Sequence, residues 1–420
     1  MTLQSKNRNV WLWCIGLGIL FPLFFQLDGG IYRDLNAIID SHGVLTKLPL
    51  PVSILVCLAA LVFLPSDKRR AGVAVAMIVG TVFVSLLSLW LAADGSTSPL
   101  RKLIVTLQIL LPMVGLLLGQ LVDDRDKVIA RAFLVVLSVV VPWQLLATWM
   151  QGGLILTHYL YAFSIYSHFQ YVTLILVCAF AYSLTSLWEE YRLWLCVMAV
   201  LMFVYVTASL SFLTIFAYLA LAAAFGGREL WRYRTNSRGR IAALALIALI
   251  VLGAFAYFGK MDGQRASVEG EHGLFHGKFK SVLQGKIPLN VQERFGDWKL
   301  FGKGILETPQ TILVGHPEPM PREIRASPHN WYMDTVYTFG LVALLPILSM
   351  IAYTGYLCWR QRKTLSTETW WLLAIVFYLV IIDSNFKVTL RQPYPGIFAY
   401  FLWGVLLSRL RPPAVSRHGA

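Results

Sequence analysis

Charged residues are scarce in this chain. Only 14% of its 420 residues are Asp, Glu, Lys or Arg, whereas 57% are hydrophobic, and the mean hydropathy is +0.64. A soluble protein of this length carries roughly 25% charged residues. The shortage of charge excludes a large soluble domain, and we expect an all-α integral membrane protein.

The chain also lacks paired cysteines. None of its cysteines forms a CxxC motif, and all of them fall inside hydrophobic runs: Cys14, Cys57, Cys178, Cys196 and Cys358. This pattern favours buried packing thiols over disulfides or metal ligands.

A cleavage site is missing as well. The first hydrophobic run, residues 10–27, follows Lys6 and Arg8 as it would in a signal peptide, but no small-residue cleavage pattern comes after it. We therefore interpret this run as a retained first helix.

Long hydrophobic runs are what the chain does contain. A helix needs about 20 apolar residues to cross a bilayer core. On this criterion we predict about 12 transmembrane helices, at residues 10–27, 51–65, 71–93, 103–122, 132–151, 171–188, 193–209, 211–225, 241–259, 330–358, 370–384 and 396–409. Only Ser209-Leu210-Ser211 separates the seventh from the eighth, so these two form either a tight hairpin or a single span.

The basic residues predict the topology. With the N-terminus in the cytoplasm, 20 of the 36 Lys and Arg residues fall on the cytoplasmic side, against six on the outer face outside one long loop. The positive-inside rule then places both chain ends in the cytoplasm. Topology and anionic head groups account for the net charge of +14 better than nucleic acid does.

Three parts follow from this topology. Residues 1–259 hold transmembrane helices one to nine, residues 260–329 form the long outer loop, and residues 330–420 hold the last three helices and a short cytoplasmic tail. The loop carries ten basic residues. Long loops cross the membrane largely regardless of charge, so the predicted topology stands.

The long outer loop shows helical patterning. Asn290 and Glu293 have the spacing of a capping box, with Arg294 at the edge of the apolar stripe that follows. Helical intervals separate the members of that stripe, Val291, Phe295, Trp298 and Ile305, and a second amphipathic piece runs through Phe275, Phe279, Val282 and Leu283. We expect both pieces to lie on the membrane surface, apolar face down, and to roof a cavity.

The best candidate for chemistry is His329, at the end of this loop. Pro328 sets a turn just before the helix that begins at Trp331, and Gly340 and Pro346 interrupt that helix. A neutral imidazole with a pKa near 6.5 can accept a proton from a hydroxyl group. His329 is therefore the predicted catalytic residue; the alternative is a helix N-cap or an interfacial anchor.

Most of the other histidines also fall on the predicted outer face: His42, His158, His168, His272, His276 and His316. We interpret His42, His158 and His168 as ordinary loop residues. His272 and His276 have the i, i+4 spacing of a metal-binding pair, but no third ligand or acidic motif accompanies them, so we expect no metal.

The residues around His329 also carry a resemblance. His329-Asn330, then nine residues, then Gly340 resembles the signature of the O-antigen ligases, which share a superfamily with the O-antigen polymerases and some protein oligosaccharyltransferases. The segment Gln292–Trp298 looks like the Arg/Trp helix of the family's outer loop. Two departures stand beside these matches: Ala343 replaces a Gly, Thr or Tyr, and the segment 209–212 has no arginine where many relatives have a Ser-Arg pair.

The resemblance implies a GT-C-like glycosyltransferase in the bacterial inner membrane, with its active site facing the periplasm. Its donor would be O-antigen linked to undecaprenyl pyrophosphate, and its acceptor a sugar hydroxyl of lipid A–core. Membrane lipids would surround it, and nucleic acid would not be a partner. The resemblance implies neither a cofactor nor a metal. The implied reaction is a direct inverting displacement in which His329 removes the proton of the acceptor hydroxyl.

A departing pyrophosphate needs positive charge beside it. No DxD-like acidic pair faces outward to hold a metal, and arginine presents a rigid, permanently charged fork to phosphate. The candidates are first Arg294, Arg322 and Arg325, and second Arg101, Lys102, Lys387 and Arg391. Asn330 and Asp334 are candidates to orient the His329 ring. For each cation the alternative is a solvated or snorkelling surface charge.

Two other functions remain open at this point. An O-antigen polymerase would use the same donor with another lipid-linked glycan as acceptor, and the sequence separates it poorly from a ligase. A transporter or lipid flippase usually needs ionisable residues deep in its helices. The predicted spans are almost free of charge apart from Asp334 and Asp383, which disfavours transport.

Overall fold

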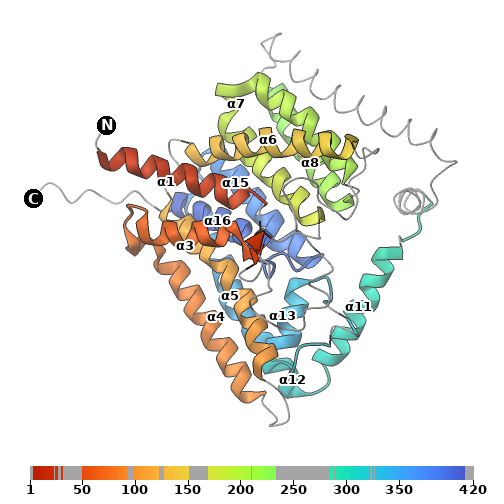
Figure 1. The fold of residues 1–420 in the computed structure, drawn as a ribbon. Coiled ribbons are helices and arrows are strands. Elements are labelled where there is room, and N and C mark those ends of the chain that lie inside the picture. The colour runs from red at the N-terminus through yellow and green to blue at the C-terminus, as the bar shows by residue number, and fades with distance from the viewer. Residues whose placement is uncertain are drawn as a thin grey trace, which may run out of the picture. The chain divides into compact units, whose positions relative to one another are not determined.

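The computed structural model describes residues 3–22, 24–26, 30–31, 50–92, 99–122, 127–150, 169–209, 211–232, 284–287, 289–321, 324–325 and 327–411. The chain divides into two compact units. Figure 1 labels many of their helices. Unit 1 comprises Met1–Ile19, Leu50–Ile129 and Glu293–Ala420, and unit 2 comprises Leu20–Pro49 and Ala130–Gln292. Both units draw on segments that are far apart in the sequence, so long-range helix packing holds each of them together.

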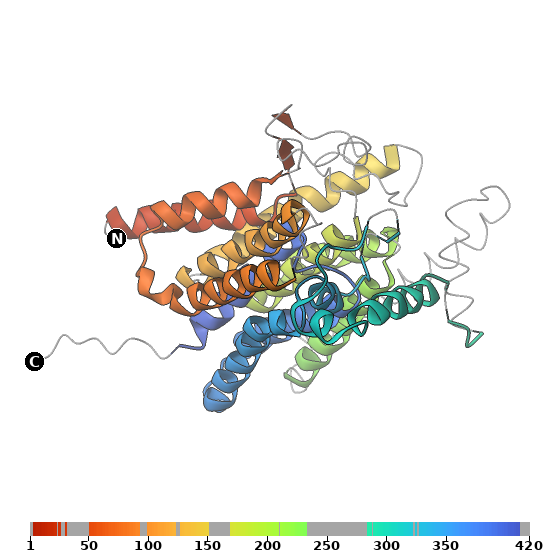
Figure 2. The same ribbon diagram turned by 90° about the horizontal axis from the view of Figure 1, so that it is seen from below.

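Unit 1 is built almost entirely from helices. In chain order these elements are α1 (Leu3–Leu20), β3 (Leu50–Pro51), α3 (Val52–Phe63), η2 (Lys68–Ala71), α4 (Gly72–Leu91), α5 (Pro99–Leu121), α11 (Leu289–Ile305), α12 (Pro309–Val314), α13 (Trp331–Phe339), η3 (Leu341–Leu344), α14 (Leu345–Gln361), α15 (Thr367–Phe377), η4 (Tyr378–Ile382), η5 (Asp383–Asn385) and α16 (Pro393–Arg409). α1 and α3 pack antiparallel, with Trp11 stacked on Phe63 and Gly18 against Val56 (Figure 2).

The core of unit 1 is the contact between α5 and α16. A Cβ atom added to Gly119 would lie 2.2 Å from the backbone oxygen of Phe401, and one added to Gly404 would lie 2.5 Å from the oxygen of Leu116. The two backbones therefore touch directly, as membrane helices do where small residues face each other. α16 is buried along nearly its whole length as a result.

Unit 2 contains a short antiparallel pairing of β1 (Phe24–Gln26) with β2 (Gly30–Ile31), followed by α6 (Val128–Met150), α7 (Phe169–Ala208) and α8 (Phe212–Arg232). α7 ends just before Ser209 and α8 begins just after Ser211, so the predicted choice is resolved in favour of two helices. They lie side by side, because the Tyr218 hydroxyl donates to the Ala199 backbone oxygen at 2.5 Å and the Tyr218 ring packs on Phe203. The hairpin is one of the two arrangements that the sequence pattern left open.

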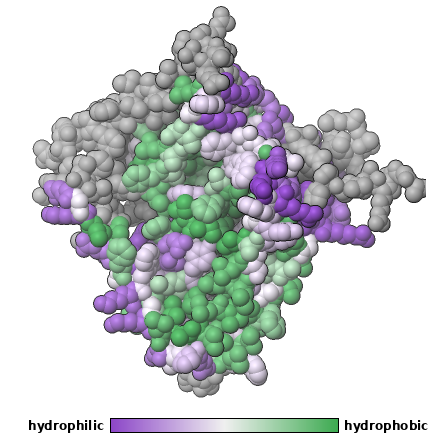
Figure 3. Space-filling model, turned by 180° about the vertical axis from the view of Figure 1, so that it is seen from behind, coloured by the Kyte–Doolittle hydropathy of each residue, from purple (hydrophilic) through white to green (hydrophobic). Residues whose placement is uncertain are grey.

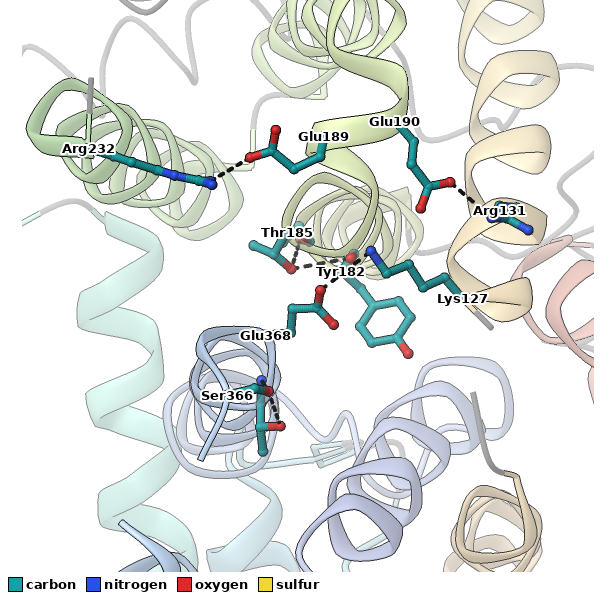
Figure 4. A network of polar contacts seen from close by, with 11 residues as sticks. Lys127, Arg131, Tyr182, Thr185, Glu189, Glu190, Arg232, Ser366 and Glu368 are labelled. Atoms are coloured by element: carbon teal, nitrogen blue, oxygen red, sulfur yellow. Dashed lines mark hydrogen bonds and ion pairs between the residues drawn. The ribbon is translucent and has the colours of Figure 1, made fainter. Parts of the chain in front are cut away.

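α7 is itself two helices joined at a kink. Tyr191 has the non-helical angles φ −131° and ψ 36°, at the break predicted between residues 188 and 193. Next to the kink, Glu190 accepts from Arg131 of α6 at 2.9 Å and Glu189 pairs with Arg232 of α8 (Figure 4). These ion pairs tie the kink to both neighbouring helices.

Seven helical segments among the described residues are long and apolar enough to cross a membrane. Two more of the predicted spans correspond to shorter helices, α3 and α16, with 12 and 17 residues, and the predicted span 241–259 lies outside the described residues. The predicted first span, residues 10–27, falls on α1, which is not among the seven and ends at Leu20, before the strand β1. Large hydrophobic side chains are exposed on these helices, among them Phe83 and Trp90 of α4. Hydrophobic residues cover much of the surface drawn in Figure 3. These helices are those of a membrane protein in length and composition, and the number 12 stays a prediction.

One predicted span is divided by the structure. We expected residues 330–358 to form a single transmembrane helix, but α13 ends at Phe339 and the membrane-length segment runs from Leu341 to Gln361. The cause is Gly340, whose φ of 78° and ψ of 175° lie in a region that only glycine adopts readily. Pro346 does not break α14, because it sits in its first turn, where no helical N–H bond is lost.

The α5–α16 contact gives a stability prediction. We expect Gly119→Ala to lower the melting temperature of the detergent-solubilised protein, because the new methyl group would force two backbones apart; overpacking of this kind costs about 1–3 kcal/mol or more. Gly355→Ala in α14 is the matched control, since no atom lies within 4 Å of the added Cβ. Thermal unfolding followed by size-exclusion chromatography measures both. Equal melting temperatures would contradict the packing described.

Candidate functional site

The helix α13 is bounded by two residues in unusual backbone conformations. His329, directly before the N-cap, has φ 52°, and Gly340, the C-cap, has φ 78°. Positive φ is uncommon for a residue other than glycine and costs about 1–3 kcal/mol, so neighbouring contacts must hold His329 in place. The two fixed positions of the His-Asn…Gly pattern are therefore the two ends of one short helix.

α11 supplies contacts that hold the loop before α13. Asp297 and Phe301 are buried on its inner side, and the Phe301 ring meets Tyr337 of α13 at 4.9 Å between centroids. The indole N–H of Trp298 donates to the backbone oxygen of Pro328 at 3.0 Å. The described contacts therefore join α11 to α13 and to its leading turn.

The face of α11 that packs against the protein is not the predicted apolar stripe of Val291, Phe295, Trp298 and Ile305, because Phe295 is 50% exposed while Asp297 is buried. The expected contact of that stripe with the membrane surface stays a prediction. Apolar spacing alone did not reveal the inner face, because a carboxylate with dedicated partners occupies it.

Three residues meet at the head of α13: His329, Asp297 and Arg325. Arg325 contacts the Asp297 carboxylate through two nitrogens. Its Nε lies 2.7 Å from Oδ1, and its Nη2 lies 2.9 Å from Oδ2. The same Oδ2 lies 3.2 Å from Nδ1 of His329. The His329 side chain remains 45% exposed, so the ring is held on one edge and open to solvent elsewhere.

The surroundings of His329 favour the neutral ring. Burial lowers the pKa of His329 below 6.5, the positive charge of Arg294 lowers it further, and Arg325 acts in the same direction. Asp297 works against them, because its negative charge and its hydrogen bond raise the pKa of the imidazole. The net shift is downward, so at neutral pH the ring can accept a proton.

The two residues predicted to orient the His329 ring have other partners in the structure. Asn330 caps α13, with Oδ1 accepting from the Met333 N–H at 3.0 Å and Nδ2 donating to Asn385 at 3.3 Å. Asp334 is buried and pairs with Arg391. The carboxylate beside the ring is Asp297 instead.

Three of the predicted phosphate-binding cations are held by protein groups. Arg391 pairs with Asp334, and Lys387 lies 3.2 Å from the buried carboxylate of Asp383. Lys102 is 1% exposed and donates to the backbone oxygen of His316 at 2.8 Å. These contacts neutralise or saturate the cations in the structure as it stands.

Arg294 and Arg325 are the predicted cations that the structure brings to His329. Arg294 is half-buried on α11, one turn before Asp297. Arg322 lies outside the described residues, and so does the side chain of Arg101 in the first turn of α5. For both of these residues the predicted role stays a prediction.

The remaining histidines bear less on the site. His316 stacks on Tyr337 at 4.1 Å, and its Nε2 lies 2.9 Å from the Gly304 oxygen, which makes it part of the packing between α11 and α13. The others on the predicted outer face, His42, His158, His168, His272 and His276, lie outside the described residues. Within the described part of the chain, no group of three His, Cys, Asp or Glu side chains is placed to hold a metal ion.

A narrow groove runs beside α13, on the side of α4 and α5. Its lining is mostly apolar with a few hydroxyl groups, and it comprises Thr81, Ser85, Ile109, Met113, Trp331, Thr335, Phe339, Ala343 and Ile347. The groove lies between α13, the helix that follows His329, and the hydrophobic helices α4, α5 and α14.

Asp297 is the residue that the sequence did not single out. It lies in the segment that resembles the family's Arg/Trp helix, and the spacing of three residues places it on the same helical side as Arg294. That spacing is a weak signal, because one acid on a loop helix is usually a solvated residue. Its partners come from positions 28 and 32 residues further along the chain, which only the fold brings together.

Comparison with models of known protein families finds no match to this chain, and comparison with curated protein sequences finds none either.

The buried pair of Asp334 and Arg391 generates a prediction. We expect Asp334→Asn to destabilise the protein by about 3–5 kcal/mol, because it leaves the guanidinium of Arg391 without its carboxylate in a buried setting. The double change Asp334→Leu with Arg391→Met removes both charges and is expected to recover most of the loss. Melting temperatures of the purified variants measure this. A double variant no more stable than the single one would show that the pair is not coupled.

Proposed function

We propose that this protein is an inverting glycosyltransferase of the bacterial inner membrane, an O-antigen ligase, with its active site facing the periplasm. The observation that carries the proposal is the cluster at the head of α13. There a neutral imidazole, open to solvent, stands beside Arg294 and Arg325 in a chain of membrane-length helices. A proton acceptor next to fixed positive charge suits the attack of a hydroxyl group on a donor with an anionic leaving group.

The proposed reaction is one displacement. His329 takes the proton of a sugar hydroxyl on lipid A–core, and the oxygen forms a bond to the anomeric carbon of O-antigen linked to undecaprenyl pyrophosphate. The bond from that carbon to the pyrophosphate breaks, and its electron pair stays on the phosphate oxygen. The anomeric configuration inverts because the attack is direct, and the imidazolium returns its proton to solvent or to the departing pyrophosphate.

The cations divide into two groups in this proposal. Arg294 and Arg325 stabilise the leaving pyrophosphate, since both stand at His329 and a guanidinium binds phosphate with a rigid fork. Arg325 is paired with Asp297, but its side chain is 38% exposed and so remains accessible to a ligand. Arg322 and Arg101 are further candidates for this role. The other three cations, Lys102, Lys387 and Arg391, stabilise the packing of unit 1 through their contacts with buried groups. These contacts explain how the three cations can be buried when no ligand is bound.

The membrane supplies the rest of the donor site. A prenyl tail is as apolar as the bilayer core, so it can remain among lipids while only the pyrophosphate reaches His329. The exposed hydrophobic side chains of α4 support this arrangement. Neither a cofactor nor a divalent metal takes part in the proposed reaction.

The decisive test is lipopolysaccharide gel analysis of a strain that lacks the gene. We expect the wild-type gene to restore the O-antigen ladder and His329→Ala to fail despite normal membrane levels. Lys299→Ala is the matched control, since this exposed lysine lies on α11 outside the cluster and should restore the ladder fully. A ladder with His329→Ala would contradict the proposed base.

Two further outcomes of the same experiment separate the alternatives. A deletion strain that still attaches one O-unit to core would indicate a missing polymerase, which uses the same donor. Transfer by the purified protein is expected to persist in excess chelator. Activity that chelation abolishes and a divalent cation restores would overturn the metal-free scheme.

The lowered pKa of His329 gives a pH prediction. Transfer requires the neutral ring, so kcat/KM is expected to stay constant at neutral pH and to fall only as the pH drops through a pKa below 6.5. Arg294→Gln removes a positive charge that disfavours the imidazolium, so the acid limb should move to higher pH. Lys299→Gln is expected to leave it in place. An unmoved limb in Arg294→Gln would contradict the electrostatic account.

A further inference from the structure

We propose that Asp297 is the positioning residue of His329: it fixes the ring with its proton on Nδ1, so that Nε2 is the atom that accepts the proton. This inference rests on the proposed function and deepens it. It assigns a role to a residue of α11 that the sequence did not single out.

The hydrogen-bond chemistry of the pair determines the tautomer. A neutral imidazole has one nitrogen that donates and one that accepts. The ionised carboxylate of Asp297 can only accept, and its Oδ2 lies 3.2 Å from Nδ1 of His329. Nδ1 must therefore carry the proton, which leaves the lone pair on Nε2 at the other edge of the ring.

Arg325 holds the carboxylate in place. Its guanidinium is permanently charged and contacts both oxygens, Oδ1 at 2.7 Å from Nε and Oδ2 at 2.9 Å from Nη2. The two contacts fix the plane of the carboxylate, and with it the direction from which Oδ2 meets the imidazole. The Asp297 side chain is only 8% exposed, so water competes little for either partner.

The backbone on both sides of the pair is also held. Trp298, next to Asp297, donates to the oxygen of Pro328, next to His329, at 3.0 Å. This parallel link sets the distance between α11 and the turn at His329. The positive φ of His329 is thereby maintained by contacts with α11, which aim the ring at Asp297.

Asp297 also acts on the charge that forms during the reaction. Among the groups that face His329, Arg294 of α11 and Arg325 of the preceding loop disfavour the imidazolium, and Asp297 favours it. When Nε2 accepts the proton, the carboxylate at Nδ1 stabilises the new positive charge. Without Asp297, burial and two arginines would oppose the protonation that the reaction needs.

A simpler role for Asp297 is to hold Arg325 alone. The two roles predict different results, because a partner of Arg325 would affect donor binding, whereas a positioning residue of His329 affects the proton transfer. We therefore compare kcat with KM and measure the titration of His329 by a method that does not depend on transfer.

The experiment uses the full-length purified protein and Asp297→Asn. We expect kcat to fall by about 10²–10⁴-fold, the range that general-base catalysis contributes, with little change in the KM for the donor. The titration of His329 is followed by its reaction with diethyl pyrocarbonate, which modifies the neutral ring, with mass spectrometry of the peptide that contains it. The midpoint of that reaction should shift to lower pH than in the wild type, because the charge that raises the pKa is gone.

Two variants control the result. Glu293→Gln removes the same charge from the exposed side of α11 and should leave kcat and the midpoint unchanged. Asp297→Glu keeps a carboxylate and should return the midpoint toward the wild-type value. If Asp297→Asn does not fold, the double variant Asp297→Asn with Arg325→Gln is compared with Arg325→Gln alone, and kcat should be lower in the double variant.

The outcomes separate this inference from the proposed function. Wild-type protein that transfers no glycan would overturn the proposed function, whereas the shift of the His329 midpoint would still test its coupling to Asp297. Active wild type with an unchanged midpoint and an unchanged kcat in Asp297→Asn would overturn the positioning role alone. A rise in KM with kcat intact would assign Asp297 to Arg325 instead.

Discussion

The structure depends most on one constraint: a charge taken out of water must meet an opposite charge. Burying an unpaired ion costs several kcal/mol even after the surroundings relax. Each of three largely buried carboxylates in unit 1 has a basic partner, in the pairs Asp297–Arg325, Asp334–Arg391 and Asp383–Lys387. The pairs join segments on both sides of α13, namely α11 before it and residues 383–391 after it. Pairing of charge therefore positions the short helix.

The constraint explains which parts of the site could be predicted from the sequence. His329, Gly340 and the loop cations carry local signals: a turn before a helix, a glycine at a break, and charge where membrane topology does not expect it. The pairing of each cation is not local. Arg391 and Asp334 are 57 residues apart, and Asp297 and His329 are 32 residues apart. Composition cannot distinguish a cation with a carboxylate partner from one that faces a phosphate, which is why Lys387 and Arg391 were candidates for phosphate binding.

The fold shows the same division. Hydrophobic length predicted most of the membrane-length helices of the described residues, and Ser209 with Ser211 marked a point where the sequence allowed either a turn or a single span. Boundaries failed where backbone conformation overrides hydrophobicity, as at Gly340, which ends α13 although apolar residues continue on both sides. The inner face of α11 was also missed, because its buried members include a charged residue. The spacing of apolar residues reveals the face of a helix that packs through apolar contacts. It does not reveal a face that packs through ion pairs.

The fixed ends of α13 have a consequence for chain length. Each residue added to an α-helix turns everything beyond it by about 100°. His329 and Gly340 are both tied down by contacts outside α13, the first to Asp297 and the second against the backbone of Leu313. Inserting or deleting one residue between them would rotate Asp334 away from Arg391 or pull His329 off Asp297. The nine residues of this helix therefore act as a spacer of set length that does not tolerate a change in the number of its residues.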